Sequence, residues 1–517
     1  MSSISLNTCI LILKEHHLLK SSAVQDAVST KMEYISYDSR DIQTDTLFFC
    51  KGKNFRPTYL AMAKKNGANC YVAEQPYPEG VGLHALIVRD VTKAMALLSA
   101  AFFGFPQDDL YVVAFTGTKG KTTSAYFLKN ILDQINGGRT ALFSSVDDIV
   151  GPKPEDKFKS SLTTPESLDL FRDMRIAVDN GMTHLVMEVS SQAYKKNRVF
   201  GLTYDLGFFL NITPDHIGPN EHPNFADYLH CKLQLMVNSR KCIINAQSNH
   251  FDEIYAAATT TTNPDSIYLF ANSEFDNPNL KQPIDFRYSS EETDMRETRF
   301  KISYGSDKAK KLKIAGDYTL QMIGDFNQIN GSAAIIGAGL AGVDHDTAAK
   351  GIRHVTIPGR METVPTDKHG FIVVDYAHNK ASMMALMGFM QREFDNPKII
   401  VVVGAPGDKG VDRRAGFSQS LSKYADKAFL TTDDPGFEDP RAIAAQIDAG
   451  IDHDRCDVTI ELDRQKAIHD AITMAGPDDV VLICGKGADA FQKVRGVDTP
   501  YPTDMKVVKK VLSELGE

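Results

Sequence analysis

The residues best suited to chemistry form a glycine-rich stretch, Gly117-Thr118-Lys119-Gly120-Lys121-Thr122-Thr123, between an apolar run at 111–115 and a predicted helix over about 122–135. Glycines let the backbone approach a phosphate closely, and a helix N-terminus offers free N–H groups and the positive end of its dipole. The Lys121 ammonium could reach the β- and γ-phosphates, and the Thr122 hydroxyl could bind Mg²⁺. The stretch therefore predicts a nucleotide phosphate loop. It is a shortened one, because Phe115 stands where the full pattern requires glycine.

Two polar residues lie at the ends of apolar runs, 184–189 and 206–210, that are typical of buried parallel strands. Glu188 ends the first run, and His216 follows the second. Ligands bind at the carboxyl ends of strands in open α/β sheets, so the pair predicts a metal–phosphate site beside the loop. Lys232 lies on a predicted helix, and its spacing alone indicates only a solvated lysine. On these residues a transporter ATPase, a switch GTPase and a ligase all remain open.

The elements that must position these residues form several domains. With 517 residues the chain is too long for one core, and we expect three domains, at 1–109, 110–357 and 358–517. In the last, strands predicted at 371–374, 399–403, 427–431 and 480–484 alternate with helices such as 441–449, which is typical of a doubly wound domain. The expected fold class is α/β, with a central P-loop parallel sheet and a C-terminal Rossmann-like sheet. A polar stretch at 271–310 predicts a peripheral β-rich section.

The bulk composition excludes several classes of protein. A formal net charge of −9 argues against binding to nucleic acid or to an anionic membrane surface. The seven cysteines are scattered, which favours reduced thiols in a cytoplasmic protein over disulfides or a zinc site. The apolar run at 9–13 is too short for a signal peptide and predicts an amphipathic helix. No apolar stretch reaches about 20 residues, so we expect no membrane span.

Eight motifs in order give the chain a family resemblance. They are TGTKGKTT at 116–123, MEVSSQAY at 187–194, NITPDHIG at 211–218, YLHCK at 228–232, GDFNQIN at 324–330, PGRME at 358–362, VDYAHN at 374–379 and GKGADAFQ at 485–492. From about Tyr37 to Asp504 the sequence resembles the Mur ligases of peptidoglycan synthesis. The resemblance implies that ATP, with Mg²⁺, phosphorylates the carboxylate of UDP-N-acetylmuramoyl-L-alanyl-D-glutamate. The amine of an amino acid then attacks the acyl phosphate.

The resemblance also assigns roles to individual residues. It implies that Lys121 and Thr122 hold phosphate and Mg²⁺, that Glu188 and His216 are metal ligands, and that Lys232 is carbamylated to bind a second Mg²⁺. The other matching positions are Ser39 for uridine; Thr163, Thr164, Ser190 and Arg198 for the muramoyl dipeptide; Asn327 and Asn330 beside adenine; and Arg360, Asp375 and His378 reaching the nucleotide from the C-terminal domain.

The amino-acid pocket is where the sequence departs from its relatives. Arg414 matches the arginine that holds the incoming α-carboxylate, and Asp433, Asp434, Gly485 and Asp489 match the other pocket positions. Gly436 stands where diaminopimelate-adding relatives carry arginine, so a cationic side chain is favoured and L-lysine is the expected amino acid.

Alternatives to this function remain. They are the same reaction with ornithine or meso-diaminopimelate, a folylpolyglutamate-synthase-like ligase, and a nucleotide-binding scaffold with a dead active site. Ser39, Thr163 and Thr164 disfavour the folate ligase, and retention of Lys121, Glu188, His216 and Lys232 disfavours the scaffold. The partners expected are the UDP-sugar dipeptide and L-lysine, with the protein acting as a monomer.

Overall fold

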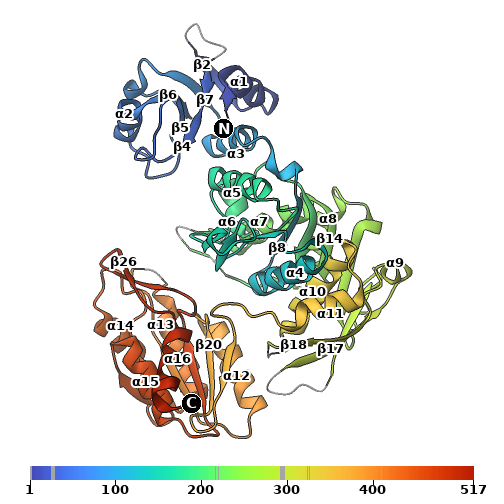
Figure 1. Cartoon of the computed structure of the whole chain (residues 1–517), viewed down its shortest axis with the longest axis vertical. Coiled ribbons are helices and arrows are strands. Elements are labelled where there is room, and N and C mark those ends of the chain that lie inside the picture. The colour runs from blue at the N-terminus through green and yellow to red at the C-terminus, as the bar shows by residue number, and fades with distance from the viewer. Residues whose placement is uncertain are drawn as a thin grey trace. The chain divides into compact units, whose positions relative to one another are not determined.

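The computed structural model describes residues 3–24, 30–215, 217–218, 221–291, 297–322, 324, 326–408 and 410–517. These residues form two compact units, shown in Figure 1. The first unit comprises Met1–Glu292, Arg299–Leu320 and Asp325–His354, and the second comprises Thr293–Thr298, Gln321–Gly324 and Val355–Glu517. Within the described ranges, every helix is too short or too polar to serve as a membrane span. His216 lies outside the described residues.

The N-terminal part of the first unit is a small sheet with helices packed on it. Its strand order is β2 (Leu19–Ala23), β7 (His84–Val88), β6 (Ala68–Ala73), β5 (Thr46–Phe49) and β4 (Tyr34–Ser36), and all pairs except β2–β7 are parallel. The helices are α1 (Leu6–Glu15), α2 (Pro57–Asn66) and α3 (Val91–Phe102). Helix α1 buries Leu6, Cys9 and Leu13, which lie three and four residues apart on one face. The predicted amphipathic helix is therefore confirmed.

An eleven-stranded sheet forms the rest of the first unit, and its parallel centre carries the phosphate loop. The order is β11 (Lys157–Lys159), β10 (Asp147–Ile149), β9 (Thr140–Phe143), β12 (His184–Glu188), β8 (Tyr111–Thr116), β13 (Tyr204–Phe209), β14 (Ser239–Asn245), β15 (Ile267–Asn272), β16 (Phe286–Ser290), β17 (Thr298–Tyr304) and β18 (Gly316–Leu320). Pairs from β9 to β16 are parallel. The β-rich section predicted at 271–310 contains β16 and β17.

Helices cover this sheet and fix where its loops lie. They are α4 (Lys121–Asn136), α5 (Ser167–Asp179), α6 (Ser191–Lys195), α7 (Phe225–Val237), α8 (Phe251–Thr259), α9 (Asp307–Lys310), α10 (Phe326–Leu340) and α11 (His345–Arg353). Helix α4 packs against α10 and α11, and the three lie together in Figure 1. A Cβ atom at Gly351 of α11 would lie 2.7 Å from the Cα of Ile131 on α4, so glycine permits this close packing.

The second unit is a doubly wound α/β domain, as predicted. Its sheet has the order β19 (Glu362–Pro365), β20 (Phe371–Asp375), β24 (Val480–Cys484), β21 (Ile399–Val403), β22 (Lys427–Leu430) and β23 (Asp457–Ile460), and all pairs except β19–β20 are parallel. The helices are α12 (Lys380–Glu393), α13 (Asp412–Tyr424), α14 (Pro440–Asp448), α15 (Arg464–Met474) and α16 (Asp504–Leu515), and a hairpin joins β25 (Phe491–Val494) to β26 (Val497–Pro500).

Candidate active site

The predicted phosphate loop joins the end of β8 to the start of α4. Its backbone is held by the segment that follows the neighbouring strand β13, because Thr118 N donates to Asn211 O at 3.1 Å and Lys119 N donates to Asn211 Oδ1 at 2.9 Å. Gly120 has φ 85°, and a Cβ there would lie 2.2 Å from Asn330 Oδ1. Both the backbone conformation and the close contact therefore require glycine at 120. This arrangement leaves α4 beginning at Lys121, with its N-terminus at the loop.

Glu188 lies beside the first turn of α4, as the strand order requires. Strand β12 runs parallel to β8 and places Glu188 opposite Phe115. The Thr122 hydroxyl donates to Glu188 Oε1 at 2.8 Å, and Ser145 donates to the same carboxylate through its backbone N at 2.7 Å and its hydroxyl at 3.2 Å. Glu188 is almost fully buried. A carboxylate and a hydroxyl this close form an all-oxygen donor set, which fits a hard cation such as Mg²⁺.

Lys232 and Lys121 converge on one backbone carbonyl. Lys232 Nζ donates to Gly117 O at 2.8 Å, and Lys121 Nζ donates to the same oxygen at 2.9 Å. Lys232 is 2% exposed, so the reading of this residue as a solvated lysine is wrong. Burial holds the pKa of Lys232 well below its usual value, and the nearby Lys121 charge lowers it further. A lysine in this position is available as a neutral amine at a lower pH than an exposed one.

A cavity of about 230 Å³ opens beside these two lysines. Predicted residues from separate parts of the first unit line it: Thr118, Lys121, Thr163, Ser190, Arg198 and Lys232. The phosphate loop bounds it on one side, and residues predicted to hold the muramoyl dipeptide bound it on another. The geometry thus places the predicted phosphate-side and substrate-side residues around one space.

The remaining substrate-side residues support this cavity. Thr164 is fully buried, and its hydroxyl donates to the backbone oxygen of Glu188 at 3.0 Å and accepts from Ser190 N at 3.1 Å. Arg198 pairs with Glu166 at 2.9 Å, and Lys51 from the N-terminal part pairs with the same carboxylate at 2.6 Å. The two cations hold the pKa of Glu166 below its usual value despite its burial. Glu166 and Lys51 were not predicted, because their partners are far away in the sequence.

Ser39 lies apart from this cavity, in the loop that follows β4. Its side chain is nearly buried, and its hydroxyl lies 3.5 Å from Met62 Sδ. It is not among the residues that line the cavity of about 230 Å³. The structure leaves the predicted uridine role of Ser39 as a prediction.

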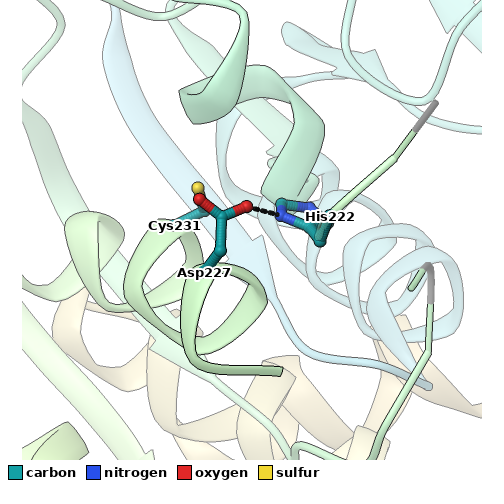
Figure 2. Close-up of side chains that lie close together, drawn as sticks. All are labelled: His222, Asp227 and Cys231. Carbon is teal, nitrogen blue, oxygen red and sulfur yellow. Dashed lines mark hydrogen bonds and ion pairs between the residues drawn. The ribbon is translucent and has the colours of Figure 1, made fainter. Parts of the chain in front are cut away.

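A hydrogen-bonded chain runs from the edge of the cavity through a buried histidine. His222 Nε2 is 2.9 Å from the Ser191 hydroxyl, and His222 Nδ1 is 2.6 Å from Asp227 Oδ2. Figure 2 shows the second contact, with Cys231 beside it, and potential ligand atoms of His222, Asp227 and Cys231 lie within 4.8 Å of one another. Both imidazole nitrogens have partners, and Lys195 Nζ lies 2.5 Å from the Asp227 carboxylate. The cluster is therefore a hydrogen-bonded network that braces α6 against α7.

The predicted nucleotide-side residues fall into both units. In the first, Asn327 and Asn330 lie buried on α10, with Asn330 Nδ2 donating to Asn327 Oδ1 at 3.3 Å. In the second, the Arg360 guanidinium lies 4.9 Å from the centre of the Tyr376 ring and lines a cavity of about 370 Å³. Asp375 ends β20 and accepts from Met361 N at 2.9 Å, and His378 Nδ1 is 2.8 Å from Tyr376 O.

The predicted amino-acid pocket contains a cation that sequence reasoning missed. Lys486 Nζ is fully buried and lies 2.8 Å from Asp434, 3.5 Å from Asp433 and 3.8 Å from Asp489. A Cβ atom at Gly485 would lie 3.1 Å from Asp433 Oδ2, so glycine makes room for these carboxylates. Burial raises the pKa of Asp433, although Lys486 opposes the shift. The only signal for Lys486 was its place between two predicted pocket residues.

Arg414, the predicted α-carboxylate ligand, already has protein partners. It lies on α13 and is 4% exposed. Its Nη2 donates to Glu438 Oε1 at 2.9 Å and to Pro406 O at 3.2 Å, and its Nη1 donates to Gln446 Oε1 at 2.7 Å. Glu438 was not predicted either. The pocket residues thus come together at the carboxyl ends of β21, β22 and β24, where doubly wound sheets bind ligands.

Two family models match the chain. One, described as the Mur ligase middle domain, matches residues 115–338. The other, described as the Mur ligase glutamate ligase domain, matches residues 359–487. Together the two matches cover more than half of the chain.

Relatives with known names match over almost the whole length. A UDP-N-acetylmuramyl-tripeptide synthetase of Lactobacillus acidophilus is 82% identical, over 99% of this chain and 98% of its own. A UDP-N-acetylmuramoyl-L-alanyl-D-glutamate--L-lysine ligase of Enterococcus faecalis is 45% identical, over 93% and 91%. A solved UDP-N-acetylmuramoyl-L-alanyl-D-glutamate--2,6-diaminopimelate ligase has a TM-score of 0.66 at 23% identity over all of both chains, which shows the shared fold. The chain is an ATP-dependent, amide-forming ligase, and it belongs to the Mur ligase family.

Proposed function

We propose that this ligase joins L-lysine to UDP-N-acetylmuramoyl-L-alanyl-D-glutamate in the synthesis of peptidoglycan precursors. The γ-phosphate of ATP is transferred to one of the two free carboxylates of the D-glutamate, giving an acyl phosphate and ADP. The amine of L-lysine attacks the acyl carbon, loses a proton and expels phosphate, leaving an amide. The observation that carries this proposal is the cavity of about 230 Å³, where Lys121 and Lys232 face Thr163, Ser190 and Arg198.

The residues around the loop suit a phosphoryl transfer between two anions. Lys121 and the N–H groups at the start of α4 offset negative charge on the nucleotide phosphates. Arg198, held by Glu166, positions the acceptor, since a fixed guanidinium binds carboxylates in a defined direction. Thr122 and Glu188 are the described residues whose oxygens would hold Mg²⁺, with His216 proposed as a further ligand. When bound, Mg²⁺ neutralises charge on the transferring phosphoryl group.

Lys232 is proposed to act as a carbamate. A neutral lysine amine adds to CO₂ and releases a proton, which turns a cation into a carboxylate-like ligand. The burial of Lys232 and its contact with Gly117 O, beside the phosphate loop, support this role, because burial favours the neutral amine that must react. A carbamate at this place would serve a second Mg²⁺.

The pocket charges favour a diamino acid with a single carboxylate. Among the described residues, the carboxylates of Asp433, Asp434 and Asp489 lie 2.8 to 3.8 Å from the Lys486 ammonium. A cluster of three carboxylates suits an incoming ε-ammonium better than it suits the second carboxylate of diaminopimelate. Gly436 has φ 61°, and a Cβ there would lie 2.3 Å from Asp408 Oδ2, so this backbone leaves no room for a carboxylate-binding side chain.

Several features of the protein remain predictions that fit this function. They are the division into domains at 1–109, 110–357 and 358–517, the monomeric state, and a place in the cytoplasm, where the nucleotide substrates are made available. The uridine contact of Ser39 and the nucleotide contacts of Asn327, Asn330, Arg360, Asp375 and His378 are proposed on the same basis.

The function is tested with purified protein, ATP, Mg²⁺ and UDP-N-acetylmuramoyl-L-alanyl-D-glutamate. Phosphate release is compared with L-lysine, L-ornithine and meso-diaminopimelate, and the background without amino acid is subtracted. We expect release with L-lysine to exceed that with the other two. No release with any amino acid would refute the proposal, and release with diaminopimelate alone would refute the argument from pocket charge.

A further inference from the structure

Arg414, the arginine that is proposed to bind the α-carboxylate, uses only some of its N–H donors in hydrogen bonds within the protein. Arg414 has protein partners on Nη1 and Nη2, while its buried Nε has no hydrogen-bond partner among the described residues. A guanidinium binds a carboxylate best through two parallel N–H donors. Glu438 receives only one of these, from Nη2. The ion pair between Arg414 and Glu438 is therefore monodentate, and the neighbouring Nε donor of Arg414 is unused.

Glu438 is more exposed to solvent than the arginine it faces. Its side chain is 29% exposed, against 4% for Arg414. The same oxygen, Oε1, also accepts from Asp408 N at 2.6 Å, so the carboxylate bridges the loop after β21 and the loop after β22. A partly exposed carboxylate can move into water at little cost. A buried guanidinium cannot be left without a counter-charge, because an unpaired buried charge is strongly destabilising.

We propose that Glu438 is an internal substitute for the α-carboxylate of the incoming amino acid. In the empty pocket Glu438 neutralises Arg414. When the amino acid binds, its carboxylate takes both Nε and Nη2 of Arg414, and Glu438 turns outward to solvent. This inference rests on the proposed function, since it takes Arg414 as the ligand of the amino-acid carboxylate.

Two consequences follow for specificity. Every amino acid must compete with Glu438 for Arg414. The stronger the ion pair between Glu438 and Arg414, the weaker the apparent affinity of the amino acid. A diamine or an ester without a free carboxylate cannot replace Glu438 as the partner of Arg414. Its affinity should therefore not increase when a substitution removes the charge of Glu438. Glu438 thereby makes the pocket selective for a free α-carboxylate.

The test compares the full-length parent with Glu438→Gln, which keeps the size of the side chain and removes its charge. We measure KM and kcat for L-lysine by phosphate release, at saturating ATP and UDP-sugar dipeptide. KM should fall about two- to five-fold, the worth of one partly exposed ion pair, while kcat stays within about two-fold. A KM that is unchanged or raised overturns the proposal, since Glu438 would then be inert or would position Arg414 for the substrate.

Two controls separate competition from a general effect. Asp457→Asn removes a carboxylate that pairs with Lys427 at 2.5 Å, at the opposite end of the sheet, and should leave the KM for L-lysine unchanged. The inhibition constant of L-lysine methyl ester, which has no free carboxylate, should not fall in Glu438→Gln. An equal fall for ester and amino acid would overturn the proposal. If the parent releases no phosphate with L-lysine, the proposed function has failed, and the same comparison is made with whichever amino acid supports release.

Discussion

At the scale of single residues, Glu188 contacts three separate segments of the candidate site. It accepts hydrogen bonds from Thr122 and from both donors of Ser145, and its own backbone oxygen accepts from Thr164. This one residue therefore connects the phosphate loop and the loop after β9, through its carboxylate, with the segment around Thr164, through its backbone oxygen. Its charge has no cation to balance it in these contacts, which is the condition in which a bound metal ion is most stabilised.

We expect Glu188→Gln to lower kcat by about 100-fold or more, because the variant loses the carboxylate that is proposed to hold Mg²⁺ against the transferring phosphoryl group, while the shape of the side chain is kept. The Mg²⁺ concentration needed for half-maximal rate should rise as well. The measurement is phosphate release over a Mg²⁺ titration. Glu253→Gln, on exposed α8, is the matched control and should behave as the parent. Unchanged Mg²⁺ dependence in Glu188→Gln would contradict the metal role.

Lys232→Ala should be nearly inactive and partly restored by short carboxylic acids. The substitution leaves a small space where the side chain was, and a carboxylic acid in that space can supply the oxygens of the proposed carbamate. Rescue is measured as phosphate release against acetate or formate concentration. Lys129→Ala, whose lysine forms a partly buried pair with Asp133 on α4, should keep its activity and show no rescue. Full activity of Lys232→Ala without any added acid would exclude the carbamate.

Sequence patterns predicted the groups that face phosphate but missed the groups that balance charge. Lys121, Thr122 and Glu188 were predicted from a loop and a strand end, and the structure brings them together. Lys486 and Glu438 were not predicted, because their partners are distant in the sequence. Lys486 pairs with Asp434, 52 residues away, and Glu438 pairs with Arg414, 24 residues away. Ion pairs between loops depend on the order of strands in the sheet, and residue spacing carries no information about it.

At the scale of elements, the strands were the most predictable part of the fold. The runs expected at 371–374, 399–403 and 480–484 are found as β20, β21 and β24, which differ by at most one residue. Long apolar runs bounded by polar residues are strong signals when a strand is buried on both faces. The short antiparallel strands β10 and β11 were not predicted, because their residues are mostly polar and show no such run.

Strand β10 carries a carboxylate whose titration should appear in the stability of the first unit. Burial raises the pKa of Asp148 to about 7, from a usual value near 3.8. Between these two values the folded protein holds a proton that the unfolded chain has lost, so the free energy of unfolding falls as pH rises from about 4 to 7. The loss is up to about 4 kcal/mol for a shift of this size.

Asp148→Asn removes this titration while it keeps the oxygen that accepts from Ser144 N. We expect the variant to unfold at a higher temperature than the parent at pH 8 and to differ little from it at pH 4.5. Thermal unfolding followed by circular dichroism at both pH values measures the difference. Asp276→Asn, at an exposed position, should show no such dependence on pH. A larger gain at pH 4.5 than at pH 8 would refute the assigned shift.

Helices α15 and α16 are held together by a buried ion pair. Arg464 donates to Asp504 through Nε and Nη2, both at 2.8 Å, and Asp504 also accepts from the Tyr501 hydroxyl and Gly487 N. Arg464→Met should reduce the free energy of unfolding of the second unit by about 3–5 kcal/mol, because it leaves a buried carboxylate without its counter-charge. Lys466→Met, on the same helix but exposed, should change it very little. Urea unfolding checks both, and equal effects would contradict the account.

At the scale of the whole molecule, the residues proposed to bind substrates fall in both units. Lys121, Lys232 and Arg198 belong to the first, whereas Arg360, Arg414 and Asp434 belong to the second. The proposed function, in which all of them take part, predicts that ligand binding draws the chain into a closed, more compact form. We expect X-ray scattering to give a smaller radius of gyration when a non-hydrolysable ATP analogue, Mg²⁺ and the UDP-sugar dipeptide are added together. Unchanged dimensions would contradict closure.

The identity of the amide product tests the central claim most directly. Purified protein is incubated with ATP, Mg²⁺, UDP-N-acetylmuramoyl-L-alanyl-D-glutamate and an equimolar mixture of L-lysine, L-ornithine and meso-diaminopimelate. The UDP-linked products are then separated and identified by their masses in mass spectrometry. The account predicts that the L-lysine adduct predominates and that ADP and phosphate form in equal amounts with it. A predominant diaminopimelate adduct, or nucleotide hydrolysis without any adduct, would contradict it.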